Sequence, residues 1–222
     1  MAFGDVIRQA SSPYTNPSGI GGDANTIWYC DYGTDKVYEL STTDFSVIRW
    51  ASSPYATPSG IGGDSNTIWH CDSLADKVYE LSTTDFSVVR QASSPSTIPS
   101  GIGGDANTIW HCDRNVGEVY ELSVSDFSVV RQASSPSTAP SGIGGDSNTI
   151  WHCDRDTDKV YELSVSDFSV VRQDRSPSSY PYGIGGDSYT IWHCDDDANK
   201  VYELDAAKAP PGPPPMSFGY IF

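Results

Sequence analysis

The sequence predicts an all-β protein, a five-bladed β-propeller in which every blade is a four-stranded antiparallel sheet. Three observations support this fold class. The string Gly-Ile-Gly-Gly-Asp begins at residues 19, 60, 101, 142 and 183, so the chain repeats every 41 residues without a slip. Each repeat contains four short strand-like segments separated by turn residues. No segment shows apolar periodicity over the length of a helix.

The second repeat illustrates the predicted strands in order. Residues 59–63 are small and lead into the turn Asp-Ser-Asn, and residues 67–72 alternate Ile and His with Trp and Cys. Residues 77–81 and 87–91 are rich in β-branched and aromatic side chains, which favour strands. The intervening segments consist mainly of Ser, Asp, Asn, Thr and Pro, as is typical of turns.

The two ends of the repeat region predict how the propeller closes. Residues 5–13 match the end of a repeat, its fourth strand and the following loop, whereas the fifth repeat stops after its third strand at Leu204. We therefore expect the N-terminal segment to supply the missing strand of the last blade. A solenoid would instead need atypical polar caps at its ends. The predicted domain spans residues 1–204.

Residues 205–222 form a Pro-rich C-terminal tail outside the repeats. The prolines at 210–215 predict a stiff, extended segment, followed by apolar residues. Three roles remain open for the tail: a linker to another domain, a hook for a partner, or a segment that packs on the propeller.

A recurring pair of strands resembles a known group of propellers. Ile-Trp-X-X-Asp followed by Lys-Val-Tyr-Glu-Leu, as at residues 68–81, resembles the short repeats of NHL-like and YVTN-like propellers, and the resemblance covers residues 5–204. It implies the propeller architecture. Propellers of this group serve in ligand binding, protein assembly and occasionally catalysis, so the resemblance does not select one function.

Charge and hydropathy exclude some partners. The net charge of −16 would repel a phosphate backbone, so we expect no nucleic-acid partner. No run of apolar residues is long enough to cross a bilayer, and the first residues do not resemble a secretion signal. Five cysteines, one in each repeat, slightly favour a reducing, cytoplasmic compartment but do not fix the localisation.

The repeated string Trp-His-Cys-Asp contains residue types that bind metals, but we interpret it as structural. Neighbouring residues on a strand point to opposite faces, so His70 and Cys71 cannot hold one ion. Copies in adjacent blades should lie about 12 Å apart, too far for a shared zinc ion or a disulfide. We therefore predict no metal, no cofactor and no disulfide. The run Asp154, Asp156 and Asp158 resembles the start of a calcium loop but lacks its later Gly and Glu.

The repeats differ mainly at one predicted rim, which carries the loops between the second and third strands and the linkers between blades. Aromatic departures gather in blades five, one and two, which are neighbours after closure. The candidate binding residues are Tyr14, Tyr32, Trp50, Tyr55, Tyr180 and Tyr182. Tyr and Trp combine apolar area with a hydrogen-bonding group, as binding surfaces require. Simple drift of loop sequences is the alternative explanation.

These patterns predict a non-catalytic binding or scaffold module, monomeric by itself or part of a larger chain or assembly, that presents its variable rim to a protein partner. A lectin with glycan sites between blades is one alternative. An enzyme with its site at the channel mouth is another, but the Ser, His and Asp residues that could form a triad are all repeated copies, whereas a catalytic site usually needs a unique residue.

Overall fold

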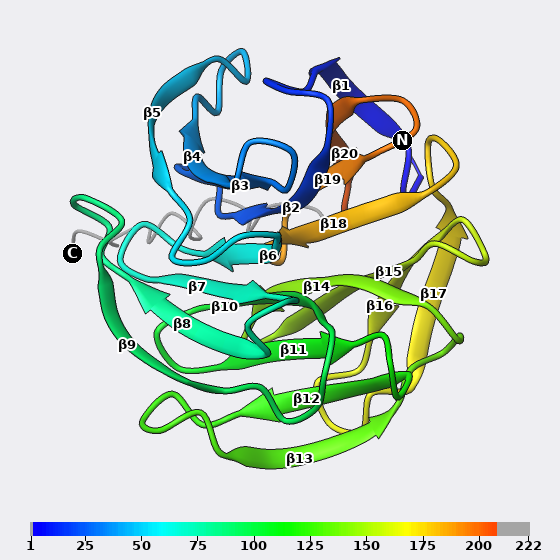
Figure 1. The fold of residues 1–222 in the computed structure, drawn as a ribbon. Coiled ribbons are helices and arrows are strands. Elements are labelled where there is room, and N and C mark those ends of the chain that lie inside the picture. Colours follow the sequence, from blue (N-terminus) through cyan, green and yellow to red (C-terminus); the bar gives the residue numbers. More distant parts are fainter. Residues whose placement is uncertain (1, 208–222) are drawn as a thin grey trace, which may run out of the picture.

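The computed structural model describes residues 2–207, which form five four-stranded antiparallel sheets arranged as blades around a central axis (Figure 1). The predicted fold class, an all-β five-bladed propeller, is confirmed. Each sheet joins consecutive strands of one repeat, except the last, whose order is β1-β20-β19-β18. The described residues contain no helix that could cross a membrane.

The strands occupy four layers from the axis outward. The innermost strands are β2 (Pro17–Gly22), β6 (Pro58–Gly63), β10 (Pro99–Gly104), β14 (Pro140–Asp146) and β18 (Pro181–Gly186). The second layer is β3 (Ile27–Asp31), β7 (Ile68–Asp72), β11 (Ile109–Asp113), β15 (Thr149–Asp154) and β19 (Thr190–Asp195). The third is β4 (Lys36–Leu40), β8 (Lys77–Leu81), β12 (Glu118–Leu122), β16 (Lys159–Leu163) and β20 (Lys200–Asp205). The outermost strands are β5 (Val47–Ser52), β9 (Val88–Ser93), β13 (Val129–Ser134), β17 (Val170–Arg175) and β1 (Val6–Ser11).

The predicted closure between the chain ends is confirmed. Strand β1 pairs antiparallel with β20, with Val6 opposite Leu204 and Ala10 opposite Val201, and Figure 1 shows the blue N-terminal strand beside the orange last strand. The predicted tail begins at residue 205, but β20 extends through Asp205. The part of that tail from residue 208 onward lies outside the described residues.

The N-terminal segment also supplies an aromatic side chain that the repeat comparison did not predict. In four blades a Phe from the turn between the third and fourth strands packs against a Trp of the preceding blade, as Phe86 packs edge-on against Trp28. At the fifth such place Phe3 stacks on Trp151, with ring centroids 5.8 Å apart, and the Arg172 guanidinium lies 4.4 Å from the Phe3 centroid. Phe3 therefore completes the last blade together with β1.

The core lies between adjacent blades, where the repeated tryptophans are buried. Each Trp indole N–H also donates to a backbone carbonyl of the next blade, for example Trp28 to Asp64 at 3.0 Å. Trp192 makes the same contact with Asp23 at 2.9 Å, across the junction of the last and first blades. The closure therefore repeats the geometry of the other four interfaces.

The innermost strands approach so closely that only glycine fits at their contacts. A Cβ atom on Gly60 would lie 2.8 Å from both the Gly101 Cα and the Ile102 backbone nitrogen. Equivalent glycines in the other blades meet the next strand in the same way. The space along the axis accordingly has no room for a water molecule. The centre of this propeller is packed backbone rather than an open channel.

Candidate functional site

One end of the axis carries the residues that differ between blades. The register places Pro17 opposite Asp31 at this end of the first blade and Gly22 opposite Ile27 at the other end. The linkers between blades and the loops after the second strands therefore share one rim, as predicted. We call this end the variable rim.

A cavity of about 160 Å³ opens at the variable rim, above the closed axis. Its walls come from the first, second, third and fifth blades. It is lined by Ser18, Tyr32, Thr57, Pro58, Ser59, Ser73, Ile98, Pro99, Ser100, Arg114 and Tyr182. We call this space the axial cavity.

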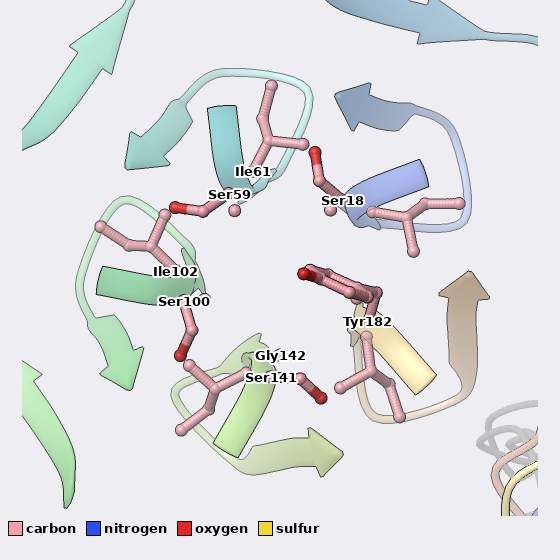
Figure 2. Close-up of a pocket in the computed structure, with 15 residues that line it drawn as sticks. Ser18, Ser59, Ile61, Ser100, Ile102, Ser141, Gly142 and Tyr182 are labelled. Carbon is pink, nitrogen blue, oxygen red and sulfur yellow. The ribbon is translucent and has the colours of Figure 1, made fainter. Parts of the chain in front are cut away.

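Tyr182 makes the top of the axis asymmetric. Four blades carry Ser at this position, and in Figure 2 the Tyr182 side chain reaches toward the centre of the circle that these serines form. The hydroxyls of Ser59, Ser100 and Ser141 each donate to the Pro carbonyl of the next blade, at 2.6 to 2.8 Å. Among the described residues, Ser18 has no such carbonyl partner, and its hydroxyl lies 3.4 Å from the Cys30 sulfur.

Two of the six predicted aromatic residues, Tyr32 and Tyr182, meet at the axial cavity. The Asn16 side-chain amide donates to the Tyr32 hydroxyl oxygen at 3.1 Å. Partial burial, the nearby Asp196 carboxylate and Tyr182 raise the pKa of Tyr32, so its hydroxyl is protonated at neutral pH. With its oxygen already accepting the amide hydrogen, the hydroxyl can donate its own proton to a ligand.

The other four predicted residues lie elsewhere on the surface. Tyr14 packs on Tyr38, with ring centroids 5.6 Å apart. Trp50 lies on the outermost strand β5, where the Lys36 ammonium is 3.6 Å from its ring centroid. Tyr55 and Tyr180 are about half exposed in linkers. None of these four residues is among the described residues that line the axial cavity.

Arg114 lines the cavity but was not among the predicted site residues. It occupies the same repeat position as Tyr32, Ser73, Arg155 and Asp196, directly after the buried Asp that ends the second strand. The variation at this position was visible in the sequence. The predicted binding residues are all Tyr or Trp and therefore do not include this Arg.

The linkers between blades take two conformations at the residue before the conserved Pro. In three of them this residue has a positive φ, between 59° and 67°, and its N–H donates at 2.9 to 3.0 Å to an Asp of the preceding blade. These pairs are Thr57 with Asp35, Ile98 with Asp76, and Tyr180 with Asp158. A positive φ is strained for a β-branched residue, and Thr57 and Ile98 both line the axial cavity.

The other two linkers show why the conformation differs. Here the preceding blade offers no carboxylate at the corresponding position, because it carries Gly117 or Asn199. The linker N–H then donates to the Asp that ends the second strand of its own blade. Asn16 donates to Asp31 at 3.0 Å and Ala139 to Asp154 at 2.9 Å. The linker conformation thus depends on whether the preceding blade carries an Asp at this position.

The strained linkers leave buried carboxylates less well satisfied. Asp72 accepts backbone N–H bonds from Leu74 and Ala75 with Oδ1, but its Oδ2 has no hydrogen-bond partner among the described residues. Burial raises the pKa of Asp72 to about 6. Asp195 lies in the fifth blade, which follows the strained linker of Tyr180. Burial raises its pKa to about 6 as well. These carboxylates lie beneath the rim and cap the turns that follow the second strands, which agrees with the structural interpretation of the repeated string.

The four histidines of the repeated Trp-His-Cys-Asp string are fully buried. His193 Nδ1 lies 2.8 Å from the Gly183 carbonyl oxygen and Nε2 lies 3.0 Å from the Ser176 hydroxyl. The carbonyl can only accept, so Nδ1 donates and Nε2 accepts from the hydroxyl. Burial lowers the pKa of all four histidines to about 4. They are neutral structural groups that tie a linker serine to the second strand.

The five cysteines are buried and form no disulfide. Burial raises the pKa of every one of these thiols, which removes the thiolate needed for reaction. No group of three or more His, Cys, Asp or Glu side chains within residues 2–207 could hold a metal ion. Among the described residues, the polar groups of the rim therefore include hydroxyls, side-chain amides, Asp carboxylates and the guanidinium groups of Arg114 and Arg155.

The fold and the rim together define the class of this protein as a five-bladed β-propeller with a cavity at one end of its axis. No protein-family model matches the chain, and no curated protein matches it. Among solved structures, a glutaminyl cyclase from Myxococcus xanthus is similar, with 13% identity, a TM-score of 0.72, and coverage of 90% of this chain and 96% of that one.

Two lyase structures are also similar. A virginiamycin B lyase from Staphylococcus aureus has 15% identity and a TM-score of 0.55, over 89% of this chain and 98% of that one. A streptogramin B lyase has 17% identity and a TM-score of 0.53, over 87% of this chain and 66% of that one. At these identities the likeness concerns the fold.

Proposed function

We propose that this protein is a non-catalytic binding module that recognises a protein partner with its variable rim. One observation carries the proposal: three residues that interrupt the fivefold repeat at the variable rim, Tyr32, Arg114 and Tyr182, come from different blades and line a single cavity. Repeated residues build the fold, whereas these three departures from the repeat lie together where a ligand has access.

The chemistry of the cavity supports binding rather than catalysis. Its described lining residues offer hydroxyls and one guanidinium, and they include no carboxylate, imidazole or thiol that could act as a general base. The imidazoles and thiols of the chain are buried below the rim. Aromatic rings beside an Arg are typical of the residues that contribute most to protein interfaces.

Selection from a peptide library tests this proposal. The immobilised full chain is compared with the double variant Tyr32→Ser/Tyr182→Ser, which introduces residues found at the same positions in other blades. A matched control is Tyr189→Asn, which restores the repeat at an exposed Tyr on the opposite rim. We expect peptides that bind the native chain and the control but not the double variant.

Two outcomes contradict the proposal. If the double variant still binds the selected peptides, the binding site does not depend on Tyr32 and Tyr182 and lies elsewhere on the protein. Binding of glycans on an array, lost on substitution of the exposed Tyr14 and Tyr55 and accompanied by no peptide binding, would favour the lectin instead.

A further inference from the structure

We propose that the axial cavity is a carboxylate site that receives a small acid with an apolar body, such as the C-terminal residue of a peptide. This inference rests on the proposed function, because it names the group that the rim recognises. It is carried by the charge, the hydrogen-bond donors and the size of the cavity.

The charge of the cavity is opposite to that of the protein. The chain has 29 acidic and 13 basic residues, yet the charged side chain among the described lining residues is Arg114. Asp196 influences Tyr32 but does not line the cavity. A carboxylate that enters meets a guanidinium, whose planar pair of donors matches two carboxylate oxygens.

Arg114 differs from the repeated arginines because it is not used by the fold. The five repeated arginines each pair with a Glu of the same blade, and none of these ion pairs includes Arg114. Each of the five also donates to a backbone carbonyl of the next blade, as Arg49 does to Thr83 at 2.5 Å. Arg114 is half-buried at the cavity wall. Its guanidinium is therefore available to a ligand.

The other walls divide into a polar and an apolar part. Tyr32 and Ser18 provide hydroxyls that are not donated to a protein carbonyl or carboxylate among the described residues. The remaining wall includes Ile98, Pro99 and the ring of Tyr182. A carboxylate fits the first part and an aliphatic side chain fits the second.

The size of the cavity limits the ligand. Its 160 Å³ is close to the roughly 150 Å³ of an engineered protein cavity that binds benzene. This volume accommodates a carboxylate with a side chain of about the size of valine or leucine. A longer peptide must leave the cavity across the rim, so a chain end fits better than an internal acidic residue.

Titration calorimetry on the full chain tests the inference with four probes. Isovalerate and N-acetyl-Gly-Leu carry a free carboxylate, and isovaleramide and N-acetyl-Gly-Leu-amide are their neutral counterparts. We expect each acid to bind about tenfold or more tightly than its amide, because a charge-assisted hydrogen bond is lost. Tighter binding of the peptide acid than of isovalerate would identify a peptide C-terminus as the source. The reverse would identify a free organic acid.

Two arginine variants provide the matched comparison. Arg114→Gln removes the cation from the cavity, and Arg155→Gln removes the Arg at the same repeat position in the fourth blade, outside the cavity lining. We expect the affinity for the acids to fall about tenfold or more in R114Q and to remain unchanged in R155Q. Thermal unfolding of both variants should match the native chain, since neither Arg forms an ion pair with the described residues.

Three results would overturn the carboxylate site. The acids and amides could bind equally, the two arginine variants could have equal effects, or neither acid could bind at millimolar concentration. The proposed rim function is judged separately by the peptide library. If Tyr32→Ser/Tyr182→Ser abolishes peptide binding while the acids fail, only the assigned ligand chemistry is wrong.

Discussion

The axis and the variable rim obey different constraints although they are built from the same repeat. Along the axis, five strands touch backbone to backbone, and a single added carbon at Gly60 has no room. At the rim a few residues away, one repeat position holds Tyr32, Ser73, Arg114, Arg155 or Asp196. Fivefold packing fixes the residues at the axis, whereas the loops above it can change without disturbing that packing.

The largest effect that tests this comparison is expected from a glycine at the axis. Gly60→Ala places a Cβ 2.8 Å from rigid backbone atoms, and we expect it to lower the free energy of unfolding by about 3 kcal/mol. Gly117→Ala is the control at the rim, where φ is +65° but no atom lies within 4 Å of an added Cβ. Its cost should be about 1 kcal/mol, from backbone strain alone.

Denaturant unfolding of both glycine variants measures these values. Equal losses of stability would show that the strands can move apart at the axis and that the contrast with the rim is wrong.

A second prediction concerns the layer between the axis and the outer strands, where the first blade carries Tyr29 in place of His. His152→Tyr introduces the same residue in the fourth blade. The linkers before these two blades have the same conformation, in which the linker N–H donates to the Asp of its own blade. The folded-state pKa of His152 is about 4, below its ordinary value of 6.5, because burial disfavours the charged form. Its contribution to stability is therefore present above pH 6.5 and is lost as the pH falls through 4.

The native chain should lose stability between pH 6.5 and 4, and H152Y should lose on the order of 2 kcal/mol less over the same interval. Unfolding curves measured at both pH values provide the comparison. An unchanged pH dependence in the variant would mean that His152 does not remain neutral in the folded protein.

The smallest expected effect concerns the strained linkers of the rim. Asp35→Asn makes the first blade resemble the fifth, which has Asn199 at this position and is followed by an unstrained linker. We expect the Thr57 N–H to turn to Asp72, as Asn16 does to Asp31. The new hydrogen bond and the loss of the Asp35 charge, which helps to raise this pKa, should together bring the pKa of Asp72 down from about 6 toward its ordinary value of 3.8.

Carboxyl carbon shifts followed by NMR against pH measure this change, and stability should alter by about 1 kcal/mol. Asp195 is an internal reference, because Asp158 still binds its linker and its pKa should remain at about 6. If the pKa of Asp72 stays at about 6 in D35N, the carboxylate of the preceding blade does not control the linker.

Much of the fold could be predicted because its information is local and repeated. The predicted strands of the second repeat agree with β6, β7, β8 and β9 to within two residues at each end. The role of Phe3 could not be predicted in the same way. It stands one position away from the Phe of the other repeats when the following strands are aligned, and only closure brings it against Trp151.

The candidate site was predictable in part. The variation of the loops indicated the correct rim for Tyr32 and Tyr182, but it did not show that Tyr14, Trp50, Tyr55 and Tyr180 lie away from the axial cavity. The position of a residue along the repeat predicts the rim of the propeller on which it lies. Its distance from the axis depends on the path of the loop and on the direction of the side chain.

The sequence by itself determined the number of blades, their strands, the closure of the propeller and the rim on which the repeats differ. These follow from the period of 41 residues and from alternation and turn chemistry within each unit. Only the tertiary structure decided that Tyr32, Arg114 and Tyr182, from three blades, line one cavity. That meeting depends on contacts between residues far apart in the chain, which no single repeat contains.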